Sequence, residues 1–157
     1  MVGDGSNRYQ FIYAQDLITA LLKASEHGHT TLFGIGSERV KPLRDVYGYV
    51  IEKANSTSRV VSLPKSITLP AMKLAHKLKI SPLGPYHYKM IAEDFSFDIS
   101  KIKRDLDWTP TLTNEEMLFR AYEYYHSNRK EIDQRTNVSA HKQSAKMGVI
   151  RLLKWVS

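Results

Sequence analysis

The sequence contains no cysteine among its 157 residues, which excludes disulfides, thiolate metal sites and cysteine nucleophiles. It also lacks any apolar run approaching the roughly 20 residues that a membrane-spanning helix needs. Its start, MVGDGSNRYQ, is polar where a signal peptide would be apolar. Together these absences predict a soluble cytoplasmic protein. Any imidazole chemistry would have to come from the six histidines.

The charge balance is strongly basic, with a net charge of +7, while 42% of the residues are hydrophobic. The apolar content is enough to form the core of one compact domain. The positive charge favours an anionic partner, which could be a nucleic acid, an acidic membrane surface or a phosphorylated ligand. A nucleic acid is the least favoured of the three, because the chain has no arginine-rich run and no aromatic RNA-binding signature.

Short extended runs alternate with stretches of helical periodicity along the first 128 residues. Helical spacing predicts a helix capped by Asp16 and ended by Gly28, one beginning at Pro42, and others over 67–80, 99–106 and from Thr113 to about residue 128. Extended runs predict strands over 9–14, 30–36, 59–64 and 95–98, and the prolines and glycine of 81–86 predict a loop. This alternation predicts an α/β fold.

The chain divides into three regions by composition. Residues 1–128 carry the α/β pattern and are predicted to form a partial α/β and substrate-binding region, whereas residues 129–144 are polar and are predicted to be a linker. Residues 145–157 form an amphipathic C-terminal segment, with apolar positions on one side and basic residues largely opposite. This segment could lie on an anionic membrane or dock on the protein's own core or a partner.

Three local patterns suggest catalysis or binding, and each has a simpler explanation. Tyr49 and Lys53 share a helix face, as in the proton-transfer pair of short-chain dehydrogenases, but ordinary apolar helix positions surround them. The Gly34-Ile35-Gly36 turn would need a further glycine at Arg39 to match a dinucleotide loop. His27 and His29 flank a helix-ending glycine, and no third metal ligand has a useful spacing. We therefore predict no metal site and no catalytic residue in this chain.

The stretch FSFDISKIKRDLDWTPTLTNEEML carries the most specific pattern. It resembles a D-x-S-K-x-x-x-x-L-x-W-x-P motif of the extended short-chain dehydrogenase/reductase family, the NAD(P)-dependent nucleotide-sugar epimerases and dehydratases. The matching positions are Asp98, Ser100, Lys101, Leu106, Trp108 and Pro110, while Asp107 stands where the family usually has glycine. In the physical interpretation, Trp108 and Pro110 hold the preceding helix against the core.

Two further blocks extend this resemblance over most of residues 3–126, in the family's order. GDGSNRYQFIYAQDLITALL resembles the family's glycine-rich loop, strand and following helix, and TLFGIGSE resembles its late Rossmann strand. The resemblance implies the C-terminal part of a Rossmann-like protein, with late sheet strands and a mostly helical substrate-binding lobe. The family's cofactor loop and Tyr-x-x-x-Lys pair lie in the other half of a chain about twice as long.

The resemblance implies NAD or NADP as the cofactor of the full-length family, with none expected to bind this chain alone. It also implies a nucleotide-sugar or related anionic small molecule as ligand. Candidate substrate-binding residues are Arg8, Tyr9 and Gln10, at the family's phosphate-binding arginine position, and Lys89, near its second arginine. Tyr9 occupies the first arginine position itself, and Lys89 supplies charge without the two-pronged geometry of arginine.

The sequence is also compatible with other partners and functions. A missing N-terminal half could complete the enzyme, or the exposed edge of an incomplete sheet could drive self-association. The chain could instead be a standalone binding or assembly module, peripheral to a membrane through its basic amphipathic C-terminus.

Overall fold

The structure, a computed structural model, describes residues 1–81 and 83–135, and these contain six helices. In chain order the helices are α1 (Ala14–Ser25), α2 (Leu43–Lys53), α3 (Lys65–Lys77), α4 (Pro85–Met90), α5 (Ser100–Leu106) and α6 (Asn114–Gln134). The predicted linker and C-terminal segment beyond residue 135 lie outside the described residues. Within the described ranges, no helix is long and apolar enough to cross a membrane.

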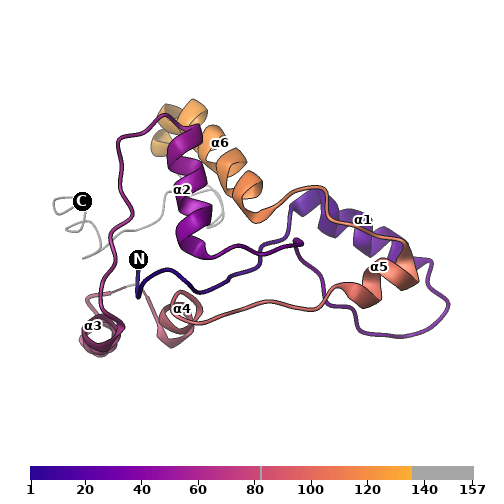
Figure 1. The fold of residues 1–157 in the computed structure, drawn as a ribbon, viewed down its shortest axis with the longest axis horizontal. Helices are drawn as coiled ribbons and strands as arrows, with labels where there is room; N and C mark the ends of the chain where they lie inside the picture. The colour runs from indigo at the N-terminus through magenta and orange to yellow at the C-terminus, as the bar shows by residue number, and fades with distance from the viewer. Residues whose placement is uncertain (82, 136–157) are drawn as a thin grey trace.

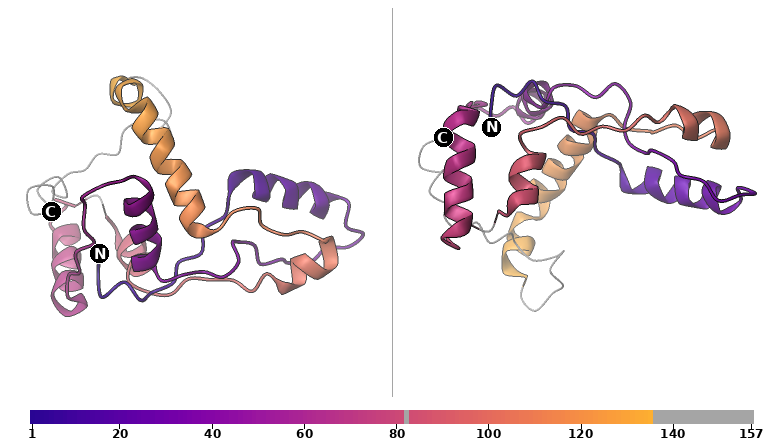
Figure 2. Two further views of the ribbon diagram at one scale, coloured as in Figure 1. Left: turned by 45° about the horizontal axis from the view of Figure 1, so that its top comes forward. Right: turned by 90° about the horizontal axis from the view of Figure 1, so that it is seen from below.

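The helices form two groups joined by extended segments (Figure 1). α1 and α5 lie together at one end of the molecule, and the second group contains the packed pairs α2 with α6 and α3 with α4. The views in Figure 2 show the same separation after rotation. Residues 7–13, 30–41 and 91–99 run between these groups and connect the two ends of the molecule.

The predicted α/β fold with late sheet strands is wrong for this structure. Across residues 1–81 and 83–135 the extended segments form no ladder, and the pairing is limited to two isolated parallel bridges, Val2 with Leu63 and Tyr9 with Phe95. A strand is stable only when neighbouring strands accept its backbone hydrogen bonds. Here the segments around residues 9, 63 and 95 each have a single bridge, and segment 30–36 has none among the described residues. The sequence pattern of a strand is present, but the partners that would make a sheet are not among the described segments.

Asp16 has a different role from the predicted helix cap. Helix α1 begins two residues earlier, with Tyr13 as its N-cap, so Asp16 lies inside the first turn and is buried. Its carboxylate accepts hydrogen bonds from the backbone amide of Thr111, at 2.9 Å, and from the Thr111 hydroxyl, at 2.7 Å. The carbonyl of Asp16 accepts a third bond from Trp108 Nε1, at 3.0 Å. Asp16 therefore ties α1 to the segment after α5.

Trp108 is the centre of the small core at this end of the molecule. Its side chain is only 2% exposed, and it clusters with Ala20, Ile99 and Ile102. Asp107 just before it ends α5 in the left-handed conformation, with φ of 46°, at the position where the family usually has glycine. Lys23 Nζ from α1 donates to the Leu106 and Asp107 carbonyls, which satisfies the C-terminus of α5. The predicted burial of Trp108 is confirmed.

Two other boundaries differ from the sequence expectation. The predicted loop over 81–86 gives way at Pro85 to α4, because proline at the first helical position loses no hydrogen bond. Helix α6 begins at the predicted place, where Thr113 and Glu116 form a reciprocal capping box, but it continues to Gln134 into the first part of the predicted linker. Two ion pairs with i,i+4 spacing, Arg129 with Asp133 and Glu131 with Arg135, support these last turns.

Candidate functional site

The predicted binding residues Arg8, Tyr9 and Gln10 lie on one extended segment that pairs with the segment before α5. Gln10 donates its backbone amide to the Phe95 carbonyl and Phe95 donates to the Arg8 carbonyl, each at 2.8 Å. Successive side chains of an extended segment point to opposite sides. The side chains of Arg8 and Gln10 therefore reach toward residues 37–40, whereas Tyr9 lies on the opposite side.

Arg8 and Gln10 are both engaged by the protein itself. The Gln10 side chain is buried, donates to the Ser37 carbonyl at 2.8 Å and accepts from the Phe97 amide at 2.8 Å. The Arg8 guanidinium donates to the carbonyl of Val40. The Gln10 amide thus positions the segment by bonding residues 37 and 97. Arg8 is exposed and keeps further N–H donors, because a guanidinium carries five.

Tyr9 belongs to a cluster of four rings that we call the aromatic face: Tyr9, Phe11, Phe95 and Phe97. Tyr9 stacks on Phe95 with ring centroids 5.5 Å apart, and Phe95 meets Phe97 edge to face at 5.1 Å. Phe97 is 51% exposed, so part of this cluster is open to a ligand. Burial raises the pKa of the Tyr9 phenol, and the neighbouring Tyr86 phenol raises that pKa further. The Tyr9 hydroxyl therefore stays protonated and can donate a hydrogen bond at neutral pH.

Lys89 reaches the solvent from α4, one helical turn after Tyr86. Its side chain has no hydrogen-bond or ion-pair partner among the described residues. Tyr86 and Lys89 share a helix face because three residues separate them, and Tyr86 lies close enough to Tyr9 to influence its pKa. Tyr86 thus influences Tyr9 electrostatically, and Lys89 is a free cation on the same face of α4.

A polar pocket of about 450 Å³ lies on the Gln10 side of the segment. Arg39, Glu38, Lys103 and Asp98 line it together with Gln10. Lys103 pairs with Glu38, while the exposed Arg39 has no side-chain partner among the described residues and adopts a left-handed backbone with φ of 51°. The sequence interpretation missed Arg39 because it treated this position only as a missing glycine. The sequence did offer a signal for this residue, because a positively charged side chain follows the small residues of the 34–37 turn.

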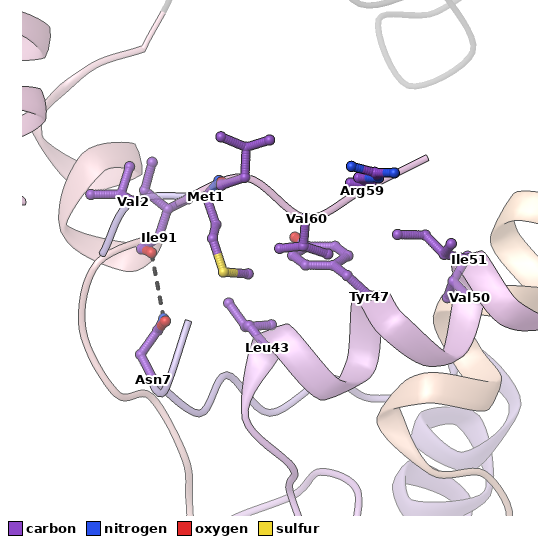
Figure 3. A pocket seen from close by; sticks show the side chains of 11 residues that line it. Met1, Val2, Asn7, Leu43, Tyr47, Val50, Ile51, Arg59, Val60 and Ile91 are labelled. Carbon is purple, nitrogen blue, oxygen red and sulfur yellow. Dashed lines mark hydrogen bonds between the residues drawn. The ribbon is translucent and has the colours of Figure 1, made fainter. Parts of the chain in front are cut away.

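A larger pocket of about 530 Å³ has an apolar lining (Figure 3). Leu43 and Tyr47 from α2 face Met1 and Val60 across it, and Asn7 hydrogen-bonds the Ile91 carbonyl at 3.4 Å on one side. Apolar walls with few polar groups do not suit a charged ligand. The polar residues predicted to bind substrate do not line this pocket, so we do not assign it to the site.

The patterns set aside in the sequence have structural roles. The Lys53 ammonium lies 5.7 Å from the centre of the Tyr49 ring, whose edge meets Phe119 of α6, so this pair joins α2 to α6. The rings of His27 and His29 lie 4.7 Å apart, and His27 also packs on Phe33. In the part of the chain that is described, no group of three or more potential ligands could hold a metal ion.

No known protein-family profile matches the chain. Among curated proteins, it is 34% identical over 155 residues to the uncharacterized protein y4nG of Sinorhizobium fredii. This alignment covers 99% of the chain and 39% of the relative. The chain therefore spans well under half the length of that relative.

Several solved structures share the fold at low sequence identity. The UDP-glucose 4-epimerase of Thermotoga maritima, solved with UDP-glucose, matches with a TM-score of 0.58 and 22% identity over 82% of this chain and 35% of that one. The dTDP-glucose 4,6-dehydratase of Bacillus anthracis, in complex with NAD, matches with a TM-score of 0.58 and 18% identity over 83% and 35%. The RMD protein of Pseudomonas aeruginosa, complexed with NADPH, matches with a TM-score of 0.54 and 15% identity over 80% and 34%. The chain thus has the fold of about a third of these longer nucleotide-sugar and NADPH-binding structures.

Proposed function

We propose that this chain is the C-terminal, substrate-binding portion of an NAD(P)-dependent nucleotide-sugar epimerase/dehydratase-like protein. The observation that carries the proposal is the agreement between two independent likenesses. The sequence blocks over residues 3–126 resemble this family in order, and the fold matches an epimerase solved with UDP-glucose and a dehydratase solved with NAD. Each of those chains is about three times as long as the matched part, so this chain supplies one portion of such an enzyme.

In this proposal the aromatic face holds a planar part of the nucleotide-sugar. An exposed aromatic ring can stack on a base, which is worth about 1–3 kcal/mol per base. The free ammonium of Lys89 and the unused N–H groups of Arg8 supply positive charge for the phosphates. The protonated Tyr9 hydroxyl adds a donor where the family has arginine. These contacts orient the substrate, whereas the cofactor and the Tyr-x-x-x-Lys pair belong to the other portion of the enzyme.

The chain is proposed to be inactive alone, because its described residues bind and position but include no assigned acid, base or hydride carrier. NAD or NADP would supply hydride chemistry in the complete enzyme. Here the residues of this chain hold the ligand and exclude water from one side of it.

Nuclear magnetic resonance can test where UDP-glucose binds. We expect shifts of backbone amide signals at residues 8–11, 86–89 and 95–97 on titration with UDP-glucose. Tyr9→Ala should weaken binding roughly tenfold, because it removes the hydroxyl donor and one ring of the aromatic face. Tyr125→Ala on α6, an exposed tyrosine far along the chain, should leave binding unchanged. Shifts confined to the apolar pocket beside α2 would contradict the assignment.

A further inference from the structure

Helix α3 presents apolar side chains to solvent along its whole length. Ile67, Ala71, Leu74 and the C-cap Leu78 follow one another at intervals of three or four residues, so they share one face of the helix. All four are exposed, with Ile67 at 70%, Leu74 at 58% and Leu78 at 59%. We call this face the α3 stripe. The apolar stripe of a helix normally faces a core, and here it faces water.

A different face attaches α3 to the rest of the molecule. Leu69, Met72 and Ala75 are partly buried, and α3 packs against α4. At the start of the helix, the Lys65 ammonium donates to the Ala92 carbonyl. The views in Figures 1 and 2 place α3 at the edge of the molecule. The α3 stripe is therefore an outward surface on a helix that is already held in place.

The part of the chain that contains α3 is uniformly basic. From Lys53 to Ala92 the sequence has no aspartate or glutamate, and its seven lysines and arginines match the whole net charge of +7. Lys73 and Lys77 lie one turn apart beside the α3 stripe. Both side chains are exposed and have no hydrogen-bond or ion-pair partner among the described residues. The stripe is thus flanked by free positive charge.

A basic helix with an exposed aliphatic face fits the surface of an anionic membrane. Aliphatic side chains enter the boundary of the acyl chains, and lysines extend their charged ends to the lipid phosphates. With 13 residues, α3 is too short to cross the membrane and can lie only along its surface.

Other anionic partners fit this helix less well. Interfaces between proteins are enriched in aromatic residues and arginine and depleted in lysine, whereas α3 contains no Phe, Tyr, Trp or Arg. A nucleic acid binds through its phosphates and by stacking on aromatic rings. It would leave the aliphatic α3 stripe in water. Lipid is the partner that covers the stripe and neutralises the lysines together.

We propose that the α3 stripe, with Lys73 and Lys77 beside it, docks the protein on a membrane surface rich in anionic phospholipid. The charge of residues 53–92 attracts the protein to this surface, and burial of the stripe then adds apolar contact. This inference goes beyond the proposed function, because it requires neither the aromatic face nor a nucleotide-sugar.

Sedimentation with lipid vesicles tests the docking with the full chain. The protein should bind vesicles of mixed phosphatidylglycerol and phosphatidylcholine, and it should not bind vesicles of phosphatidylcholine alone. Binding should weaken in about 1 M salt, where the screening length is only about 3 Å. Absence of binding to the anionic vesicles would overturn the proposal and leave a protein as the partner of the stripe. Equal binding to both kinds of vesicle would also overturn it.

A pair of lysine substitutions tests the charge. Lys73→Gln together with Lys77→Gln should weaken binding to the anionic vesicles about 25-fold, because each lysine near such a surface contributes about a factor of five. Arg129→Gln together with Lys130→Gln on α6 changes the net charge equally and should have little effect. Equal losses in the two pairs would show a general charge effect and contradict docking through α3.

A second pair of substitutions tests the apolar contact. Ile67→Ser together with Leu74→Ser should weaken binding about tenfold or more, because both side chains lose the burial that the lipid provides. The matched control is Leu21→Ser together with Leu22→Ser on α1, where the two leucines are similarly exposed at 61% and 63%. Circular dichroism should show the same helical content for each variant as for the wild type. Unchanged binding by the α3 variant would place the contact elsewhere in the chain and refute the proposal.

A fluorescent label can report the position of α3 independently of affinity. Because the chain has no cysteine, Leu74→Cys and Lys130→Cys each provide one site for a nitrobenzoxadiazole label, whose emission shifts to the blue in lipid. With anionic vesicles, the label at position 74 should shift and the label at position 130 should not. A vesicle-bound protein whose label at position 74 does not shift would rule out burial of the α3 stripe in the membrane.

Discussion

At the scale of single residues, Asp16 illustrates how one buried carboxylate organises the α1 and α5 end of the molecule. Its two oxygens bond Thr111 and its carbonyl bonds Trp108, so one residue links positions more than 90 apart in sequence. A carboxylate that accepts hydrogen bonds in a buried place holds its donors in one arrangement. The Trp-Thr-Pro-Thr stretch is therefore specified by its contact with α1.

Replacing Asp16 should destabilise the folded protein. Asp16→Ala removes the buried carboxylate that accepts both hydrogen bonds from Thr111, so the free energy of unfolding should fall by about 1.5–3 kcal/mol, the range for hydrogen bonds to charged groups. Urea unfolding followed by circular dichroism measures this change. Gln15→Ala, at the neighbouring exposed position, is the control and should change stability by less than about 0.5 kcal/mol. Equal effects of the two substitutions would contradict the role given to Asp16.

Trp108 offers a second test of the same core. Trp108→Ala removes a side chain that is almost completely buried and should cost about 3–5 kcal/mol. Trp108→Phe keeps most of the packing but loses the hydrogen bond to the Asp16 carbonyl, so it should cost less. Thermal unfolding monitored by circular dichroism can rank the two variants. A smaller loss for alanine than for phenylalanine would be incompatible with a packed indole.

Some of these residue contacts could be predicted from the sequence and others could not. The burial of Trp108 could be predicted because a large apolar ring follows a short helix at its stop. The engagement of Gln10 with Ser37 and Phe97 could not, because all three meet only through folding of distant segments. Arg39 was missed for a similar reason: its lack of a partner is a property of the folded surface.

At the scale of elements, the helices follow their sequence signals closely. Five of the six helices lie where helical spacing predicts them, since an amphipathic helix carries its own backbone hydrogen bonds and needs only one covered face. The predicted strands did not form a sheet because strand pairing depends on neighbours that no local pattern supplies. Helix α4 was missed because Pro85 was taken as a breaker although it is the first residue of the helix.

The capping box of α6 gives a pH-dependent prediction at this scale. Bonds from the Thr113 backbone amide and then its hydroxyl lower the pKa of Glu116 below its ordinary value. A carboxylate whose pKa is lowered by folding adds stability above its unfolded pKa, and this stability is lost as the pH falls through the folded pKa. Glu116→Gln should therefore destabilise the protein at pH 7, by less than about 1 kcal/mol for so exposed a group.

The difference in the free energy of unfolding between the wild type and Glu116→Gln should shrink as the pH falls. Urea titrations of the wild type and Glu116→Gln at pH 7, 5, 4 and 3 compare their free energies of unfolding. We expect the two proteins to converge at the acidic end. A gap that stays constant or widens with decreasing pH would exclude a role for the ionised Glu116 carboxylate in capping α6.

At the scale of the whole molecule, the described residues include large hydrophobic side chains that are exposed at both ends. Exposed leucine and isoleucine side chains lie at one end on α1 and at Leu32 (Leu17, Ile18, Leu21, Leu22 and Leu32), and at the other end on α3 and just after it (Leu74 and Leu78). Large exposed apolar patches mark surfaces that contact a partner. This distribution, together with a match to about a third of each similar structure, supports the proposal that the chain binds substrate as part of a larger assembly.

The small molecules that the chain binds by itself test the proposed function most directly. Isothermal titration calorimetry with UDP-glucose and, in a matched experiment, with NAD tests both halves of the claim on one preparation. We predict measurable heat of binding for UDP-glucose, reduced by Tyr9→Ala, and no binding of NAD at micromolar concentration. Micromolar binding of NAD by the chain alone, or no binding of UDP-glucose at millimolar concentration, would contradict the account.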